Sequence, residues 1–215
     1  MTAATATAPA TLRPLREMEP ETRRRIESAV LDIFSQREFH KVSLIEIATA
    51  ANVSLQTIYK YYGSKEALLF NSLDTWLGQL ASRMIDHLQG IETYQDRLRK
   101  VFWLALDFFD KNPKVAQLIM SSVYLNTWQK EPTFQQPALF GLFLKVLGEG
   151  KAKGVLSDEV EEKILLDFII GITSRMVFMW ITRGEHERHR LTDQANVWFE
   201  MLWRAIAKPA SSVRG

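Results

Sequence analysis

The sequence of 215 residues contains no cysteine. This absence excludes a disulfide framework, a thiolate metal site and a cysteine nucleophile, and it is compatible with a reducing cytoplasm, where we expect the protein to act. No stretch has the pattern of a secretory signal, and no uninterrupted apolar run has the length needed to span a bilayer. The longest apolar candidate, residues 164–181, is interrupted by Asp167 and Arg175. We therefore expect no membrane partner.

A large charge of either sign is also missing. The formal net charge is +2, with 24% charged and 47% hydrophobic residues, which is the composition of a soluble globular protein of one large or two small domains. The first 70 residues carry nine Lys and Arg against eight Asp and Glu, a net of +1. Bulk charge therefore does not indicate nucleic-acid binding, and any such inference must rest on where the charges lie.

Motifs for catalysis are missing as well. We find no Gly-rich phosphate loop, no nucleophile elbow and no paired carboxylates. His186 and His189 lie three residues apart in a charged turn, whereas a zincin motif needs two histidines four apart on one helix face. We expect neither an enzyme nor a bound metal or cofactor.

What the sequence does contain is a compact capped segment at residues 43–65. Ser43 is a favourable helix N-cap, and Glu46 three residues later completes a capping box. Asn52 lies where a helix-turn-helix bend needs a residue that tolerates positive φ. Ser54 then caps a second short helix. The pattern predicts two short helices joined by a tight turn.

The second helix has a polar outer side. Ile58 and Tyr62 lie four residues apart and are predicted to face inward. An outer face of amide, hydroxyl, phenol and ammonium groups suits a DNA major groove lined by phosphates. The alternative is an ordinary helical hairpin with a polar surface. The outward residues are Gln56, Thr57, Tyr59, Lys60 and Tyr61.

The stretch ANVSLQTIYKYYGSKEALL closely resembles the helix-turn-helix signature of TetR-family transcriptional regulators. That resemblance implies an all-α fold with an N-terminal three-helix DNA-binding domain and a C-terminal helical ligand-binding and dimerisation domain. It also implies a homodimeric repressor that a small hydrophobic or aromatic ligand releases from a palindromic double-stranded DNA operator. The expected DNA-contacting residues are Ser43, Ser54, Leu55, Gln56, Thr57, Tyr59, Lys60, Tyr61 and Lys65.

Two residues depart from the family pattern. Glu38 stands where a glycine is usual, and it would be strained if it adopted a left-handed conformation. Val42 stands where a threonine is usual, which removes a hydroxyl from the expected phosphate-facing edge. Val42 and the near-neutral charge leave open an alternative, a helical ligand-binding or interaction protein that does not bind DNA.

The rest of the chain has helical periodicity and no alternating strand pattern. We expect a first helix from near Pro20 and a long fourth helix to about residue 87. Further helices are expected at 94–110, 113–129 and 135–153, followed by a long helix that is capped by residues 157–161 and ends at about residue 183, and by a last helix at 191–207. The predicted divisions are a mobile arm (1–18), the DNA-binding domain (19–66), the ligand-binding and dimerisation domain (67–208) and a tail (209–215).

Two regions of the C-terminal half are apolar nearly all round, which requires more than one partner surface. The resemblance places a dimer seam on the last two helices, and the expected interface residues are Phe168, Gly171, Ile172, Arg175, Met179, Val197, Trp198, Met201 and Leu202. Each could instead complete the core of one subunit.

Large soft or aromatic side chains suit a cavity for a flat or greasy molecule, although aromatic stripes more often pack into a core. The predicted pocket residues are Trp103, Leu106, Met120, Tyr124, Trp128, Phe143, Met176 and Trp180. Asp167 and Arg175, embedded in apolar sequence, are expected to find a charged partner or to orient a polar ligand group.

Overall fold

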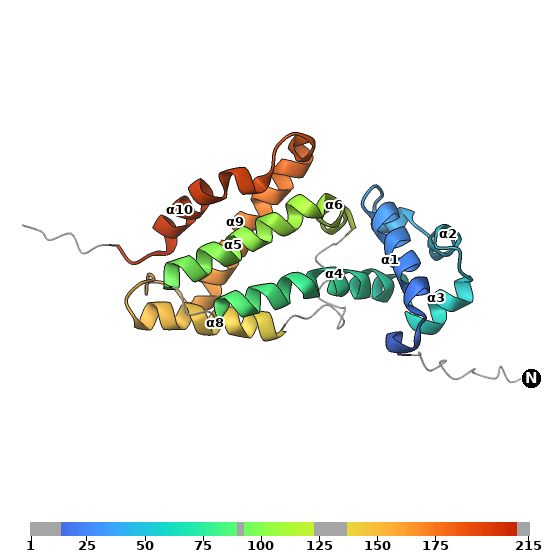
Figure 1. The fold of residues 1–215 in the computed structure, drawn as a ribbon, viewed down its shortest axis with the longest axis horizontal. Coiled ribbons are helices and arrows are strands. Elements are labelled where there is room, and N and C mark those ends of the chain that lie inside the picture. Colours follow the sequence, from blue (N-terminus) through green and yellow to red (C-terminus); the bar gives the residue numbers. More distant parts are fainter. Residues whose placement is uncertain (1–13, 90–92, 123–136, 210–215) are drawn as a thin grey trace, which may run out of the picture. The chain divides into compact units, whose positions relative to one another are not determined.

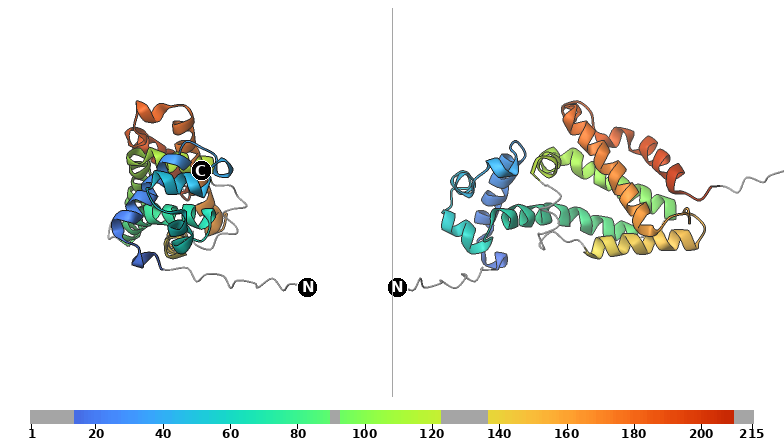
Figure 2. Two further views of the ribbon diagram at one scale, coloured as in Figure 1. Left: turned by 90° about the vertical axis from the view of Figure 1, so that its right-hand side faces the viewer. Right: turned by 180° about the vertical axis from the view of Figure 1, so that it is seen from behind.

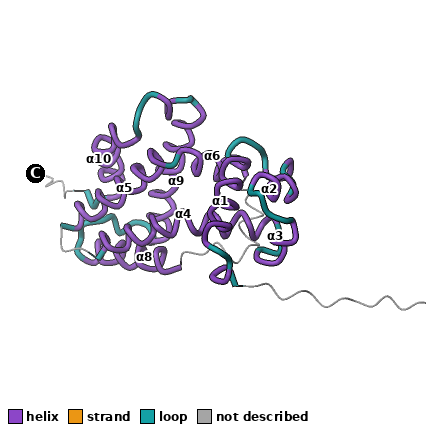
Figure 3. The backbone as a smooth tube through the Cα atoms, turned by 45° about the vertical axis from the view of Figure 1, so that its right-hand side comes forward, coloured by secondary structure: helices purple, strands orange, loops and turns teal. Residues whose placement is uncertain are grey.

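The computed structural model describes residues 14–89, 93–122 and 137–209, and the described backbone is helix joined by turns and loops (Figures 1 and 3). The expected all-α fold class is confirmed. The elements are η1 (Leu15–Glu17), α1 (Pro20–Phe34), η2 (Phe39–Lys41), α2 (Leu44–Ala50), α3 (Leu55–Tyr61), α4 (Lys65–Leu88), α5 (Tyr94–Lys111), α6 (Pro113–Ser122), α8 (Pro137–Ala152), α9 (Glu162–Thr182), η3 (Glu185–Glu187), η4 (Leu191–Gln194) and α10 (Ala195–Ile206).

The chain divides into two compact units, and the boundary falls inside α4, after Asp74. This lies eight residues beyond the predicted boundary at residue 66. A helix of 24 residues is about 36 Å long, so α4 supplies residues to both units. Its first turns carry Leu68, Leu69 and Leu73, which are fully buried.

The first unit is built on α1, α2 and α3, which pack on one another in sequence order. Pro20 is the first residue of α1, and the Glu19 carboxylate accepts hydrogen bonds from the amides of Glu21 and Thr22. The core side of α1 carries four buried side chains, Ile26, Ala29, Val30 and Phe34. Their helical spacing places them in one buried stripe along α1.

The predicted N-terminal arm of residues 1–18 overlaps the described part of the chain at residues 14–18. Residues 1–13 lie outside the described part of the chain, but Leu15–Glu17 form a 3-10 turn and Met18 is buried, with 5% of its surface exposed. Burial of Met18 removes apolar surface from water and attaches this end of the chain to the first unit.

In the second unit α5 is the central helix. Helix α10 and the η4 turn pack against α5, and α9 packs against both α5 and α8. Figures 1 and 2 both show α9 crossing α5. Asp110 at the end of α5 accepts hydrogen bonds from the backbone amides of Leu191 and Thr192, which fixes the turn that leads into α10.

Helix α9 is long and apolar enough to cross a membrane by length and composition alone, contrary to the sequence expectation. Only 22% of its most apolar window is buried inside the subunit. Asp167 and Arg175, which we expected to be buried charges, are both exposed on this helix. The helix packs on α5 and α8 along one side and leaves an apolar face uncovered.

Candidate DNA-binding surface and ligand cavity

Helix α3 is oriented by two side chains that point inward. Ile58 is fully buried and Tyr62, at the C-cap, is 2% exposed, as the spacing predicted. Burial raises the pKa of the Tyr62 phenol to about 12, so this ring remains neutral inside the first unit. At the other end Ser54 is the N-cap, and its hydroxyl accepts a hydrogen bond of 3.1 Å from the Thr57 amide.

The opposite side of α3 is polar and accessible. Gln56, Tyr59 and Lys60 are exposed, and the Lys60 ammonium lies 5.0 Å from the centre of the Tyr61 ring. The half-buried residues of the predicted set already have partners for their hydroxyls. Thr57 shares a 2.8 Å hydrogen bond with Ser54, and Tyr61 donates to the carbonyl of Glu17. The groups best placed to meet another molecule are therefore Gln56, Tyr59 and Lys60.

The turn between α2 and α3 has the predicted backbone geometry. Among the described non-glycine residues, Asn52 alone has positive φ, at 51°. The Arg25 guanidinium of α1 donates to the Asn52 carbonyl at 3.4 Å. The conditional strain at Glu38 does not arise, because its backbone is extended, with φ −63° and ψ 141°.

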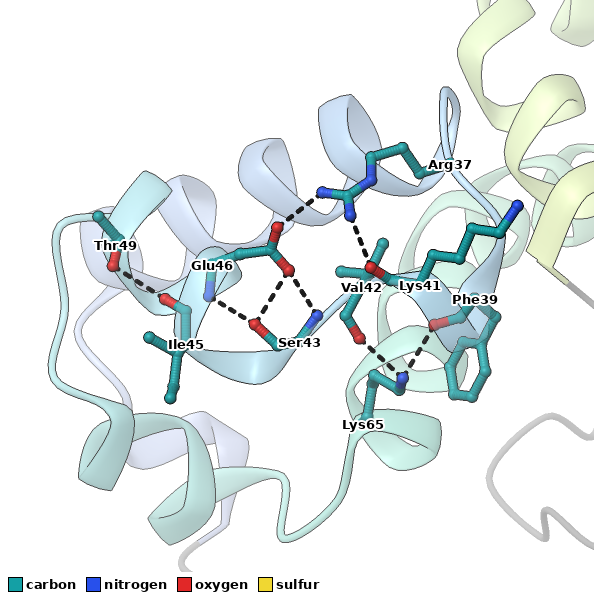
Figure 4. A network of polar contacts seen from close by, with 9 residues as sticks. All are labelled: Arg37, Phe39, Lys41, Val42, Ser43, Ile45, Glu46, Thr49 and Lys65. Carbon is teal, nitrogen blue, oxygen red and sulfur yellow. Dashed lines mark hydrogen bonds and ion pairs between the residues drawn. The ribbon is translucent and has the colours of Figure 1, made fainter.

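The N-terminus of α2 is held by a polar network (Figure 4). The Ser43 hydroxyl accepts from the Glu46 amide at 3.2 Å, and the Glu46 carboxylate accepts from the Ser43 amide at 2.7 Å. Arg37 joins the two sides of this network, because its guanidinium donates to Glu46 at 2.7 Å and to the Lys41 carbonyl at 2.6 Å. The predicted capping box is confirmed, and Arg37 is a member that the sequence pattern did not indicate.

Lys65 is directed differently from the prediction. Its ammonium donates to the carbonyls of Phe39 and Val42, at 2.8 Å each, and lies 4.3 Å from the centre of the Phe39 ring. Figure 4 shows the side chain turned toward these carbonyls. The expected phosphate ligand is therefore an internal donor, because carbonyls at the end of the η2 turn need a partner. Val42 itself is 2% exposed, so the residue in place of the usual threonine lies in the core.

A cavity of about 400 Å³ lies within the second unit, between α5, α6 and α9. Its walls are mostly apolar, and Thr173, Ser174 and Arg175 add polar groups from α9. The Arg175 guanidinium stacks over the Phe178 ring at 5.1 Å. A volume of this size falls in the range of small-molecule sites. The lining residues are Phe109, Ala116, Ile119, Gly171, Thr173, Ser174, Arg175, Val177 and Phe178.

Among the predicted pocket residues that the structure describes, none lines this cavity. Leu106, Phe143 and Trp180 are buried in packed core, Met176 is half-buried, and Trp103 is 42% exposed. The side chain of Met120 and all of Tyr124 and Trp128 lie outside the described residues.

Large side chains fill space, so a cavity forms where side chains are short. Ala116, Gly171 and Ser174 are such positions here. Their size was the signal in the sequence that would have located this cavity.

The predicted dimer residues lie mainly on an accessible surface. Phe168, Gly171, Arg175, Val197 and Met201 are exposed, and the exposed fraction reaches 58% for Val197 and 63% for Met201. Ile172, Met179 and Trp198 are half-buried. Leu202 differs, because it is 4% exposed and belongs to the core of the subunit on the inner side of α10.

Comparison with known proteins agrees with this geometry. Residues 26–71, from the buried stripe of α1 to the second turn of α4, match the family model described as bacterial regulatory proteins, tetR family. The fatty acid metabolism regulator protein of Bacillus subtilis is 24% identical over 195 residues, which cover 89% of this chain and 98% of the relative. Residues 26–71 thus form a TetR-family domain.

Solved structures of TetR-family regulators share the fold. The fatty acid degradation regulator FadR from Bacillus halodurans has a TM-score of 0.75 at 19% identity, covering 92% of this chain and 98% of that one. FadR from Bacillus subtilis in complex with stearoyl-CoA has a TM-score of 0.70 at 20% identity, covering 83% of this chain and 96% of that one. These likenesses establish the fold.

The similarity to other curated transcriptional regulators is more local. Two of them match over 102 and 83 residues, which cover 50% and 36% of their own lengths. The proteins named in these comparisons are regulators rather than enzymes.

The Arg37–Glu46–Ser43 network predicts a pH dependence for the first unit. The hydrogen bond from Arg37, followed by those from Ser43, lowers the pKa of Glu46 from 4.5 to about 2. A carboxylate with a lowered folded-state pKa stabilises the fold above its unfolded pKa, and that contribution is lost as the pH falls through the folded value. We expect Glu46→Gln to lower the thermal midpoint at pH 7, with the difference from wild type shrinking between about pH 4.5 and about pH 2.

Thermal unfolding followed by circular dichroism across this pH range is the measurement. Glu159→Gln removes an exposed carboxylate from the second unit and is the control, with a constant difference from wild type expected. A Glu46→Gln difference that does not change with pH would show that the network contributes nothing through the charge of Glu46.

Proposed function

We propose that this protein is a homodimeric transcriptional repressor that binds a near-palindromic DNA operator through α3 and is released by an amphipathic small molecule. The observation that carries the proposal is the exposed Gln56–Tyr59–Lys60 face, held outward by buried Ile58 and Tyr62 in the segment that matches the TetR family. Such a protein acts in the cytoplasm, where bacterial DNA lies.

Different side chains of α3 are proposed to contact the bases and the phosphates. An amide such as that of Gln56 can read adenine through paired hydrogen bonds in the major groove, whereas an ammonium adds attraction to phosphates. Leu55, half-buried at the start of α3, is placed to meet a thymine methyl group. Ser43 and Tyr59, which are both exposed, are the proposed phosphate ligands.

Dimerisation supplies the second recognition helix. The exposed apolar side chains of α9 and α10 include Phe168, Val197 and Met201. Exposed apolar residues that are grouped in this way mark an interaction surface, whereas scattered single ones do not. A two-fold dimer places its recognition helices on half-sites about one helical turn, ~34–36 Å, apart. This arrangement accounts for an apolar α9 without a membrane.

The cavity between α5, α6 and α9 is the proposed ligand site. Its apolar walls suit an acyl or aromatic group, and Arg175 with Ser174 offers partners for an anionic or polar head. The solved structure of FadR from Bacillus subtilis contains stearoyl-CoA. The curated Bacillus subtilis protein that matches this chain is named a fatty acid metabolism regulator. We therefore propose a long-chain acyl thioester as the effector.

The experiment that tests DNA binding is a selection of genomic fragments with the purified full-length protein, read out by sequencing. We expect enrichment of fragments that share an inverted repeat. No enrichment above a bead-only control would instead favour a helical ligand-binding protein that does not bind DNA.

Gln56→Ala should change which sites are preferred. Losing a bidentate base contact costs about 1–3 kcal/mol at the base pair concerned, so the ranking of operator variants should flatten at that position. Competition gel shifts with single-base operator variants measure this ranking. Gln36→Ala, at an exposed position before η2, is the control. An unchanged ranking would show that Gln56 does not read bases in the operator.

Met201→Glu should separate the subunits. A carboxylate placed in a buried apolar seam lacks a partner and costs several kcal/mol. Light scattering coupled to size-exclusion chromatography should give one subunit mass for Met201→Glu and twice that mass for wild type. Asn196→Glu, exposed on the same helix but off the Val197–Met201 side, should remain a dimer. A wild-type monomer would contradict the homodimer.

Stearoyl-CoA should release the wild-type protein from its operator. By linkage, a ligand that weakens DNA binding is itself bound more weakly, by the same factor, when DNA is present. Fluorescence anisotropy of labelled operator measures release, and calorimetry with and without DNA tests the reciprocity. Ile119→Trp, which fills part of the cavity, should abolish release, and free coenzyme A is the control ligand. Release that is unaffected by Ile119→Trp would place the ligand elsewhere.

A further inference from the structure

Lys65 is the first residue of α4, and its ammonium is engaged inside the first unit. Two of its three donor sites are used by the carbonyls of Phe39 and Val42, both at 2.8 Å. The same group lies 4.3 Å from the centre of the Phe39 ring, which is itself stacked on Phe34 with 5.6 Å between ring centres. The lysine is therefore held by three contacts at once.

The two carbonyls belong to the turn that delivers the chain to α2. Residues 39–41 form η2, and Val42 follows in an extended conformation with φ −104° and ψ 135°. Ser43, the N-cap of α2, comes next. Because the backbone from Val42 to Ser43 has no freedom beyond its dihedral angles, the position of the Val42 carbonyl sets where α2 begins.

A second cation completes the same turn. Arg37 donates to the Lys41 carbonyl at 2.6 Å, so the carbonyls of residues 39, 41 and 42 all have charged donors. Hydrogen bonds from charged groups are about twice as strong as neutral ones. The turn is thus held between the first turn of α4 and the Arg37–Glu46 pair.

We propose that Lys65 is a positioning residue, which promotes DNA binding by holding the Phe39–Val42 turn, and with it the start of α2, against the first turn of α4. It acts on the phosphate-facing edge through Ser43 and makes no phosphate contact of its own. This inference rests on the proposed DNA-binding function for its consequence, and on the contacts above for its structural part.

The salt dependence of operator binding separates this role from a phosphate contact. A lost phosphate contact flattens the slope of log affinity against log salt by about 0.9. Lys65→Met should weaken operator binding by about tenfold at a fixed salt concentration and leave the slope unchanged. Lys60→Met, which removes an exposed ammonium from the proposed DNA face, is the comparator and should flatten the slope.

Binding is measured by anisotropy at several potassium chloride concentrations, well below the thermal midpoint of each variant. A flatter slope for Lys65→Met would overturn the proposal in favour of a phosphate contact. An unchanged affinity of the folded variant would also overturn it, because a role in stability alone lowers only the thermal midpoint. If Lys65→Met does not fold, Lys65→Gln keeps two N–H donors and should show the same unchanged slope with a smaller loss.

Amide hydrogen exchange without DNA tests the structural part independently. The Val42 amide donates to the Phe39 carbonyl and the Ile47 amide to the Ser43 carbonyl, and both should exchange roughly tenfold faster in Lys65→Met. The Tyr62 amide, bonded to Ile58, should be unaffected. Lys41→Met, which removes an exposed charge from the same turn, should leave all three unchanged.

Equal exchange at Val42 and Ile47 in wild type and Lys65→Met would overturn the positioning role. A wild-type protein that binds no genomic fragment would overturn the proposed function instead, and the exchange result would still decide whether Lys65 holds the turn.

Discussion

The burial of Ile58 and Tyr62 determines which side of α3 is available to another molecule. A helix of seven residues is not stable alone in water, so its existence depends on the side chains that attach it to a core. Ile58 and Tyr62 attach α3 beneath one face, and the Ser54 cap closes its start. Because that face is buried, Gln56, Tyr59 and Lys60 on the other side of the helix are exposed.

Charged donors complete what apolar packing begins. The turn before α2 presents the carbonyls of residues 39, 41 and 42, and an unpaired buried carbonyl costs about as much as a lost hydrogen bond. Arg37 and Lys65 satisfy these groups from opposite sides, and Glu46 ties Arg37 to the cap of α2. Side chains that sequence reasoning assigns to a DNA surface can therefore be used by the protein itself.

Local features were predictable because their causes are local. The capping box at Ser43, the left-handed Asn52 and the inward pair on α3 depend on residues within four positions of one another. The helical periods also gave most helix positions to within a few residues, since each reflects a buried side. The match of residues 26–71 to the TetR family covers this same well-patterned region.

What the sequence by itself determined is therefore the helical architecture, the reading helix and the face it presents. Only the tertiary structure decided the partners of Lys65, namely Phe39 and Val42, which precede it by 26 and 23 residues. The same holds for the position of the cavity between α5, α6 and α9. The tertiary structure also showed that Leu202 faces inward while Val197 and Met201 remain exposed. The physical reason is that a long side chain takes the nearest unsatisfied acceptor, and a cavity forms where short side chains from separate helices meet.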